Sequence, residues 1–587
     1  MHERLPKILA LPIFASDALS SVAYATEEIL RVLILASMSA IQFPYVIYIS
    51  IAIVILLAIV VTSYRQTIHA YPSGGGAYIV AKDNLGPTAG LIAGSALTID
   101  YTLTVAVSTA AGVAAIISAW PQFSPYREAM CLGFVFIVTV GNLRGARESG
   151  LIFALPTYAF ITAALGLIGF GLYREFTEGL KIEHSVVIKQ THDLTLFLIL
   201  RAFSGGCTAM TGTEAISNAV QAFKPPEAKN ASTTLTWMAA ILGTMFLGIS
   251  YLAWRTGVIP SGDETVLSQI TRAMFGTTKY YYFVQIATMS ILVLAANTSF
   301  AGFPRLASIM ARDRYLPRQL YNVGDRLVFS NGIIILAMLA SLLIVVFKGD
   351  THALIPLYAI GVFLSFTLSQ AGMLKRFRMR RERGWKRGAV ISGIGAFLTG
   401  LVTLIFAWTK FLEGAWVVIL LIPGFVYIFS KIHEHYIQLG NQLRLTPEDA
   451  FEPVNNVILV LTPSVHRGVK RALEYTKTLS SDVRAIHVET DPVDTAIMEQ
   501  RWEQWGGGIP LIILESQYRS LVKPVLEYLQ EVKREHKNTI ITVIIPEFVP
   551  TKWWHKLLHN QSGILLKFAL LFQRDVVTSN LRYYLDK

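Results

Sequence analysis

Charged residues are scarce in this sequence of 587 residues: they make up 15% of the chain, whereas 53% of the residues are hydrophobic. With a mean hydropathy of +0.49, this composition excludes an ordinary soluble enzyme. Cysteine is also rare, because only Cys131 and Cys207 occur and both lie in apolar runs. They form neither a disulfide framework nor a metal-ligand spacing, so we interpret them as small packing residues.

Signals for secretion and for nucleotide hydrolysis are missing as well. The first apolar run continues into further runs, which excludes a cleavable signal peptide. In the C-terminal region no glycine-rich phosphate loop follows a predicted strand, since the only glycine run of that region, Gly506 to Gly508, precedes one. The net charge of +12 would suggest nucleic acid in a soluble chain, but here the position of the cations matters more than their total. We expect no enzymatic activity, no cofactor and no nucleic-acid partner.

Long apolar runs, in contrast, are abundant and predict a polytopic helical protein in the lipid bilayer. Twelve spans are predicted, near residues 8–36, 44–66, 86–118, 127–145, 150–173, 195–222, 231–254, 279–311, 329–347, 352–374, 388–408 and 414–435. One short connector is crowded with cations: Lys375, Arg376, Arg378, Arg380, Arg381, Arg383, Lys386 and Arg387. The positive-inside rule makes that face cytoplasmic. An even number of spans then places both termini in the cytoplasm of a cell-membrane protein.

The composition changes after the last span, which predicts a transmembrane domain over 1–436 and a cytoplasmic α/β domain over 437–587. Apolar runs shorten to strand length at 457–461, 483–488, 510–515 and 539–546, with amphipathic helical stretches near 465–480 and 518–536. Alternating strands and helices predict a parallel sheet. The histidines of this region lack metal-ligand spacing, and we expect surface or packing roles for them: His466, His487, His536, His555 and His559.

Three of the predicted spans each contain an acid, namely Asp17, Asp100 and Glu214. One carboxylate at the centre of a spanning helix costs about 2.5–3.5 kcal/mol, and three cost roughly 8–10 kcal/mol. Such a cost requires a positive ligand or another functional reason. We therefore predict that the three acids converge on a cation that crosses the membrane.

Polar side chains accompany the first two acids on single helix faces. Asp17, Ser20, Ser21, Tyr24 and Glu28 form one stripe, and the paired serines predict a break in the first span. A kink packed against polar neighbours is the alternative, and Glu28 can simply sit at the outer mouth. In the third span Asp100, Thr104 and Ser108 form a second stripe with Tyr101 alongside, although threonine and serine often bond back to their own helix.

Glycines interrupt the sixth span at Ser204–Gly206 and again at Gly212, beside Thr211, Thr213 and Glu214. Glycine in a span frees backbone carbonyls to line a cavity, and close helix packing through small residues is the competing explanation. Two interrupted spans at equivalent places of two five-span halves indicate an inverted-repeat transporter with its site at the midplane. Carboxylate, hydroxyl and carbonyl oxygens suit a hard cation.

Several long motifs carry a family resemblance: SDALSSVAYATEEI (16–29), YRQTIHAYPSGGGAYIVAKDNLG (64–86), IDYTLTVAVS (99–108), GCTAMTGTEAISNA (206–219), LVLAANTSF (292–300), LIPLYAIGVF (354–363) and WWHKLLHNQS (553–562). The sequence resembles the KimA-type potassium importers, in the KUP group of the amino acid–polyamine–organocation superfamily. The resemblance implies a LeuT-like fold, high-affinity potassium import with protons, and dimers formed through C-terminal domains that resemble universal stress proteins. It also implies inhibition by cyclic di-AMP, for which no residues can be named.

Matching motifs imply a set of potassium ligands: Asp17, Tyr24, Asp100, Tyr101, Thr104, Thr211, Glu214 and Tyr358. Because potassium carries one charge and the site holds several acids, some acid must be protonated, and we assign that role to Asp17 or Glu214. Two departures from the family pattern stand out. The chain begins only a few residues before the first span, and Ala25 replaces the glycine that commonly follows the tyrosine.

Two alternatives remain open at this point. An amino acid or polyamine symporter would share the fold, although Asp17 would repel a substrate carboxylate and the fifth span offers no lysine to mimic a sodium ion. A membrane-tethered nucleotide sensor is the alternative of another class, and the three buried acids argue against it.

Overall fold

The computed structural model describes residues 4–36, 45–74, 76–144, 150–179, 194–262, 264–322, 329–381, 384–447, 449, 453–516, 520–535, 538–549 and 562–584. The chain forms two compact units, Met1–Leu443 and Arg444–Lys587. The division falls at the end of helix α17 (Ala415–Gln442), because the helix continues with polar residues beyond position 436, where the composition changes.

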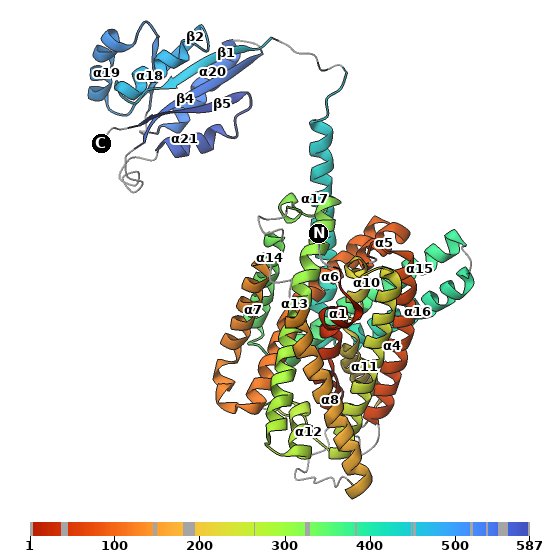
Figure 1. Cartoon of the computed structure of the whole chain (residues 1–587). Helices are drawn as coiled ribbons and strands as arrows, with labels where there is room; N and C mark the ends of the chain where they lie inside the picture. The colour runs from red at the N-terminus through yellow and green to blue at the C-terminus, as the bar shows by residue number, and fades with distance from the viewer. Residues whose placement is uncertain are drawn as a thin grey trace. The chain divides into compact units, whose positions relative to one another are not determined.

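The first unit is helical (Figure 1). Its other principal helices are α1 (Lys7–Ser20), α2 (Val22–Ala36), α4 (Tyr45–Ala70), α5 (Ala77–Leu85), α6 (Pro87–Ala119), α7 (Arg127–Leu143), α8 (Gly150–Glu178), α9 (Leu196–Gly206), α10 (Ala215–Asn218), α11 (Glu227–Thr256), α12 (Val266–Phe275), α13 (Lys279–Arg312), α14 (Ser330–Val346), α15 (Thr351–Arg380) and α16 (Trp385–Thr409). Among the described residues, ten helical segments are long and apolar enough to cross a membrane. The two further predicted spans correspond to the interrupted segment that begins with α9 and to α14, which has 17 residues.

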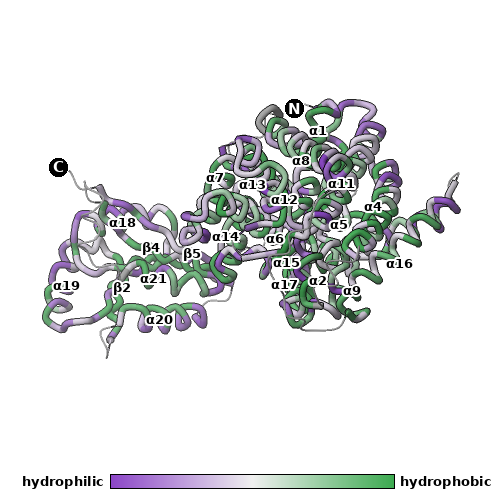
Figure 2. The backbone as a smooth tube through the Cα atoms, turned by 90° about the horizontal axis from the view of Figure 1, so that it is seen from below, coloured by the Kyte–Doolittle hydropathy of each residue, from purple (hydrophilic) through white to green (hydrophobic). Residues whose placement is uncertain are grey.

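The exterior of this unit is more apolar than that of a soluble protein, and its interior contains buried acids. Hydrophobic residues predominate along helices such as α4 and α16 (Figure 2), and large apolar side chains such as Phe136, Leu155 and Phe397 are exposed. The acids Asp17 and Asp100 are buried in the interior. An apolar exterior around a partly polar interior is what a lipid environment requires, so the unit is a multi-pass membrane bundle.

The two predicted breaks differ in kind. Ser21 separates α1 from α2 but keeps right-handed helical angles, and its hydroxyl donates to the Ala18 carbonyl at 2.5 Å. The first span therefore continues through Ser21 with helical angles and is not unwound, and the serine hydroxyls bond back to their own helix. The sixth span is unwound: α9 gives way to a 3₁₀ turn (Cys207–Met210), an extended Thr211 and a left-handed Gly212 with φ +73°.

The second unit is built on a five-stranded parallel sheet, as the alternating pattern predicts. Its strands are β1 (Asn455–Leu461), β2 (Asp482–Glu489), β3 (Leu511–Glu515), β4 (Thr539–Val549) and β5 (Val576–Tyr584), in the order β3-β2-β1-β4-β5. Alternate residues of β1 supply two cores. Leu459 packs toward α20 (Val522–Glu535) and α21 (Ser562–Leu570), whereas Val460 packs toward α18 (Arg467–Thr476) and α19 (Pro492–Trp505). Helices therefore cover both faces of the sheet (Figure 1).

Of the histidines in this unit, His466 and His487 have structural roles, and His536, His555 and His559 lie outside the described residues. His487 is buried, with Nδ1 2.9 Å from the Thr462 carbonyl oxygen. His466 caps α18, because its Nδ1 accepts hydrogen bonds from the backbone N–H groups of Gly468 at 3.2 Å and Val469 at 3.4 Å.

The cap predicts a local pH dependence. Burial lowers the pKa of His466 below its ordinary value of 6.5, and a protonated Nδ1 cannot accept. The unfolded chain therefore binds this proton more tightly, so the cap contributes fully above pH 6.5 and is lost as the pH falls below 6.5 and through the lower pKa of His466 in the folded protein. We expect hydrogen exchange at Gly468 and Val469, corrected for intrinsic rates, to quicken several-fold between pH 7.5 and 5.5. The variant His466→Asn, which keeps an acceptor, should lose this dependence; equal acceleration in both proteins would contradict it.

Candidate cation site

The unwound part of the sixth span lies directly against Asp17. A methyl group added at Gly212 would come within 2.5 Å of Asp17 Oδ2 and 2.9 Å of the Ala18 backbone nitrogen. On the same side, Ser21 Oγ lies 3.0 Å from the Ala209 carbonyl oxygen, so its one O–H is shared between this carbonyl and that of Ala18. The two interrupted spans thus meet at their interruptions, and only glycine permits both the left-handed turn and the close approach.

Glu214 follows the unwound segment and is held by two other helices. Its Oε2 accepts long hydrogen bonds of 3.4 Å from the Tyr64 hydroxyl on α4 and from the Ser365 hydroxyl on α15. Its backbone carbonyl accepts from Ser217 Oγ at 2.8 Å. The carboxylate is therefore oriented by hydroxyls that can donate to it, while Oε1 points elsewhere.

Asp100, Thr104 and Tyr358 form a second side of the site. Thr104 Oγ1 donates to the Asp100 carbonyl at 2.9 Å, so this threonine bonds back to its own helix. It also lies 2.9 Å from Tyr358 Oη, which joins α6 to α15. The close packing of these helices depends on Gly361, where an added methyl group would approach the Ala96 carbonyl oxygen to 2.9 Å.

The remaining predicted ligands, Tyr24, Thr211 and Tyr101, lie in different parts of the bundle. Tyr24 lies on α2 and is buried, and Thr211 lies in the unwound segment, where its hydroxyl donates to the Thr208 carbonyl at 2.8 Å. The Tyr101 hydroxyl instead accepts from Asn218 Nδ2 at 3.3 Å, and its ring packs against Gly302 of α13. Tyr101 is therefore tied to the end of the sixth span rather than to Tyr358.

The three acids share one feature that suits a cation. Asp17 Oδ1, Asp100 Oδ1 and Glu214 Oε1 are each buried without a hydrogen-bond partner in the described part of the chain. The three carboxylates are also close enough to interact electrostatically with one another. Buried acceptor oxygens without donors are costly unless a positive ligand reaches them.

The acids do not form a compact metal centre by themselves. Among the residues that the structure describes, no group of three or more His, Cys, Asp or Glu side chains is close enough to hold a metal ion. A cation here would need hydroxyl and carbonyl oxygens in addition to a carboxylate, as hard cations accept.

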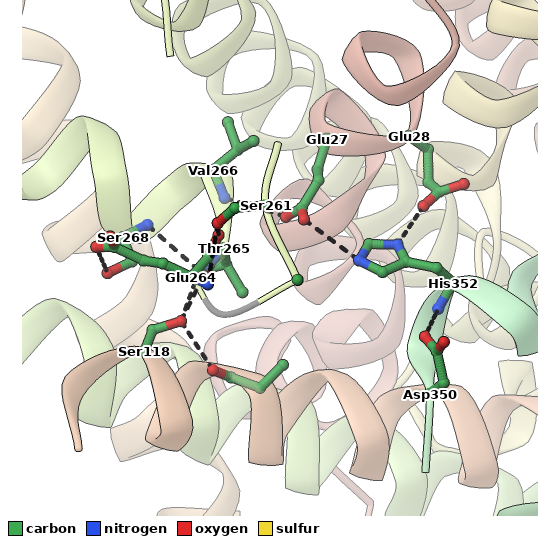
Figure 3. Close-up of polar contacts among 12 residues, drawn as sticks. Glu27, Glu28, Ser118, Ser261, Glu264, Thr265, Val266, Ser268, Asp350 and His352 are labelled. Carbon is green, nitrogen blue, oxygen red and sulfur yellow. Dashed lines mark hydrogen bonds and ion pairs between the residues drawn. The ribbon is translucent and has the colours of Figure 1, made fainter. Parts of the chain in front are cut away.

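Sequence reasoning missed the two hydroxyls that orient Glu214. Ser365 lies seven residues after Tyr358, on the same face of α15, and that spacing could have identified it. Tyr64 shows no such signal, because it is one aromatic residue in the apolar helix α4. A second polar group is formed by Glu27 and Glu28 of α2 and by His352 in the first turn of α15 (Figure 3).

Comparison with known proteins shows which families and which transporters this chain resembles. The model of the amino acid permease family matches residues 10–428, and that of the KimA potassium transporter C-terminal domain matches residues 454–583. The chain is 44% identical over 590 residues to the potassium transporter KimA of Bacillus subtilis (strain 168), which covers 100% of this chain and 97% of that protein. It is 23% identical over 335 residues to the low-affinity putrescine importer PlaP of Escherichia coli (strain K12), covering 56% of this chain and 73% of that protein.

A membrane bundle with buried acids around an unwound helix defines a secondary transporter of the amino acid permease type, and not an enzyme. Over its full length, the chain belongs to the KimA-type importers of the amino acid–polyamine–organocation superfamily.

Proposed function

We propose that this protein imports potassium with high affinity, coupled to the inward movement of protons. The observation that supports the proposal best is the set of three buried carboxylates, each with an unpartnered oxygen, at the contact between the two interrupted spans. Identity of 44% to a potassium transporter supports potassium as the cargo. The ligands are drawn from Asp17, Tyr24, Asp100, Tyr101, Thr104, Thr211, Glu214 and Tyr358, and either Asp17 or Glu214 carries the proton.

The finer architecture belongs to the same proposal. Twelve spans arranged as a LeuT-like inverted repeat would place the site at the bilayer midplane, with both termini cytoplasmic. The α/β unit, over 437–587 in the predicted division, would resemble universal stress proteins, hold a homodimer together and respond to cyclic di-AMP. The transporter is otherwise expected to need no cofactor.

The experiment is direct flux in proteoliposomes that contain the purified full-length protein. With equal potassium on both sides and an acidic exterior, we expect net potassium accumulation that a protonophore abolishes. Liposomes without protein serve as the control. Potassium movement that ignores the pH gradient would contradict proton coupling, and the absence of any potassium movement would contradict the proposal as a whole.

A polyamine is the second candidate cargo, because the chain shares 23% identity with a putrescine importer and its buried acids would attract any small cation. Radiolabelled putrescine in the same proteoliposomes separates the two. We expect no putrescine uptake and no inhibition of potassium flux by a hundredfold excess of putrescine. Saturable putrescine uptake would favour the polyamine.

A further inference from the structure

A histidine at the start of α15 is clamped between two acids in the first half of α2. His352 Nδ1 lies 2.6 Å from Glu28 Oε1, and Nε2 lies 3.3 Å from Glu27 Oε1 (Figure 3). Both glutamate side chains are almost fully buried, at 3% and 5% exposure, whereas His352 is 22% exposed. The clamp is therefore inside the protein but reachable from one side.

The clamp needs a doubly protonated ring. A carboxylate cannot donate, so the imidazolium, which has an N–H on each nitrogen and a positive charge, is the form that satisfies both the hydrogen bond from Nδ1 to Glu28 and the ion pair of Nε2 with Glu27. Glu27 cannot turn away freely, because its Oε2 accepts from the Val266 backbone N–H at 3.1 Å at the start of α12. The charged ring thus joins α15 to α2 by charge-assisted bonds.

Two small adjoining cavities meet at this clamp. One is lined by Arg127, Glu264 and Asp350, and the other by Tyr24; Glu27 and His352 line both. Glu27 and His352 therefore lie between the first cavity and Tyr24, which is a predicted potassium ligand.

We propose that His352 is a gate: bonded to Glu27 and Glu28 it closes the entry to the cation site, and on swinging out it opens that entry. This proposal rests on the proposed function, in which this face is extracellular. When the ring leaves, the two carboxylates are freed to attract an entering monovalent cation. Losing one ring proton leaves a single donor for two acceptors, so alkaline pH should favour the open gate.

The other charged groups near the ring do not replace it. Asp350 accepts from the backbone N–H of His352 at 2.9 Å, which fixes the start of α15. Glu264 is paired with Arg272 and accepts from Ser268 Oγ at 2.7 Å. Arg127 lines only the cavity away from Tyr24 and reaches the Gly262 carbonyl at 3.4 Å. His352 is thus the cation that both glutamates contact directly.

Cysteine accessibility in the full-length protein tests the gate. Ala111 on α6 lines the Tyr24 cavity, so Ala111→Cys, in a background with Cys131→Ala and Cys207→Ala, reports opening to a cationic, membrane-impermeant methanethiosulfonate added to intact cells. We expect modification at least fivefold faster with His352→Ala, and also faster with Glu28→Gln, which serves if the first variant fails to fold. With His352 present, the rate at position 111 should rise from pH 6.5 to 8.5 more than the rate at a control thiol.

The control is Ser261→Cys, an exposed position on the first cavity, whose modification should not change with His352→Ala. An unchanged rate at position 111 in both gate variants, while the control thiol is labelled, would overturn the gate. Failure to label the control from outside would instead contradict the proposed orientation. The readout does not depend on which ion is transported, so it stands apart from the flux assay.

Discussion

Replacing either Asp17 by Asn or Glu214 by Gln should lower potassium uptake in cells by roughly a hundredfold. Each substitution removes a buried acid that is proposed either to bind the cation or to carry the proton. Losing the charge that binds the cation costs about 3 kcal/mol, which is two orders of magnitude in affinity, and losing the proton carrier stops coupled uptake. Uptake should be measured at limiting external potassium, with the amount of protein in the membrane determined in parallel. Glu178→Gln is the matched control, because Glu178 is an exposed acid paired only with Arg174 among the described residues.

The same two variants distinguish the cation ligand from the proton carrier. If Glu214 carries the proton, Glu214→Gln should abolish net uptake but retain exchange of potassium across proteoliposomes at equal pH, since exchange needs no net proton movement. Loss of both net uptake and exchange in Asp17→Asn would then assign Asp17 to cation binding. Full uptake with unchanged pH dependence in both variants would show that neither acid has its proposed role.

Gly212→Ala should abolish uptake as completely as removal of the acid itself. The alanine would be held at φ +73°, and its methyl group would meet Asp17 Oδ2 at 2.5 Å and the backbone nitrogen of Ala18 at 2.9 Å. The Asp17 side chain can rotate away, but the Ala18 nitrogen belongs to the backbone of α1 and cannot move without shifting that helix. We expect uptake to fall by roughly a hundredfold, measured as for the acid variants, because the carboxylate and the unwound segment can no longer meet.

Substitutions at two control glycines separate backbone strain from the steric contact as causes of that loss of uptake. Gly86 has φ +112° but nothing within 4 Å of an added methyl group, and Gly133 is helical with equally open surroundings. Gly86→Ala tests backbone strain alone and Gly133→Ala tests the substitution alone; both should retain most of the uptake. The double variant with Asp17→Asn should be no worse than either single variant, because both act on one contact. Normal uptake in Gly212→Ala would show that this contact is dispensable.

Some features of the fold could be predicted from local patterns in the sequence. Apolar runs predicted a polytopic bundle, and the strand at 457–461 was recognisable because both of its faces are buried. The edge strand β5 was not recognisable from the sequence. Its residues are exposed or partly exposed and none is fully buried, so hydropathy gives no strand signal over Val576–Tyr584.

The interruptions show where local reasoning fails. Paired serines and a glycine pair look alike as helix breakers, yet Ser20 and Ser21 kept the first span helical through their own hydroxyl bonds. The sixth span unwound at Gly212, where the neighbouring α1 occupies the space that a side chain would need. A breaker residue only lowers the cost of unwinding, and the packing of another helix decides whether unwinding occurs.

By itself, the sequence determined that this chain lies in lipid, that it continues into an α/β unit, and that Asp17, Asp100 and Glu214 have to be compensated. Hydropathy and periodicity are sums over neighbouring residues, and these properties depend on nothing else. Only the tertiary structure decided which distant side chains meet, such as Tyr64 with Glu214 and His352 with Glu28. Such contacts depend on how all the helices pack around one another, and no short stretch of sequence records that.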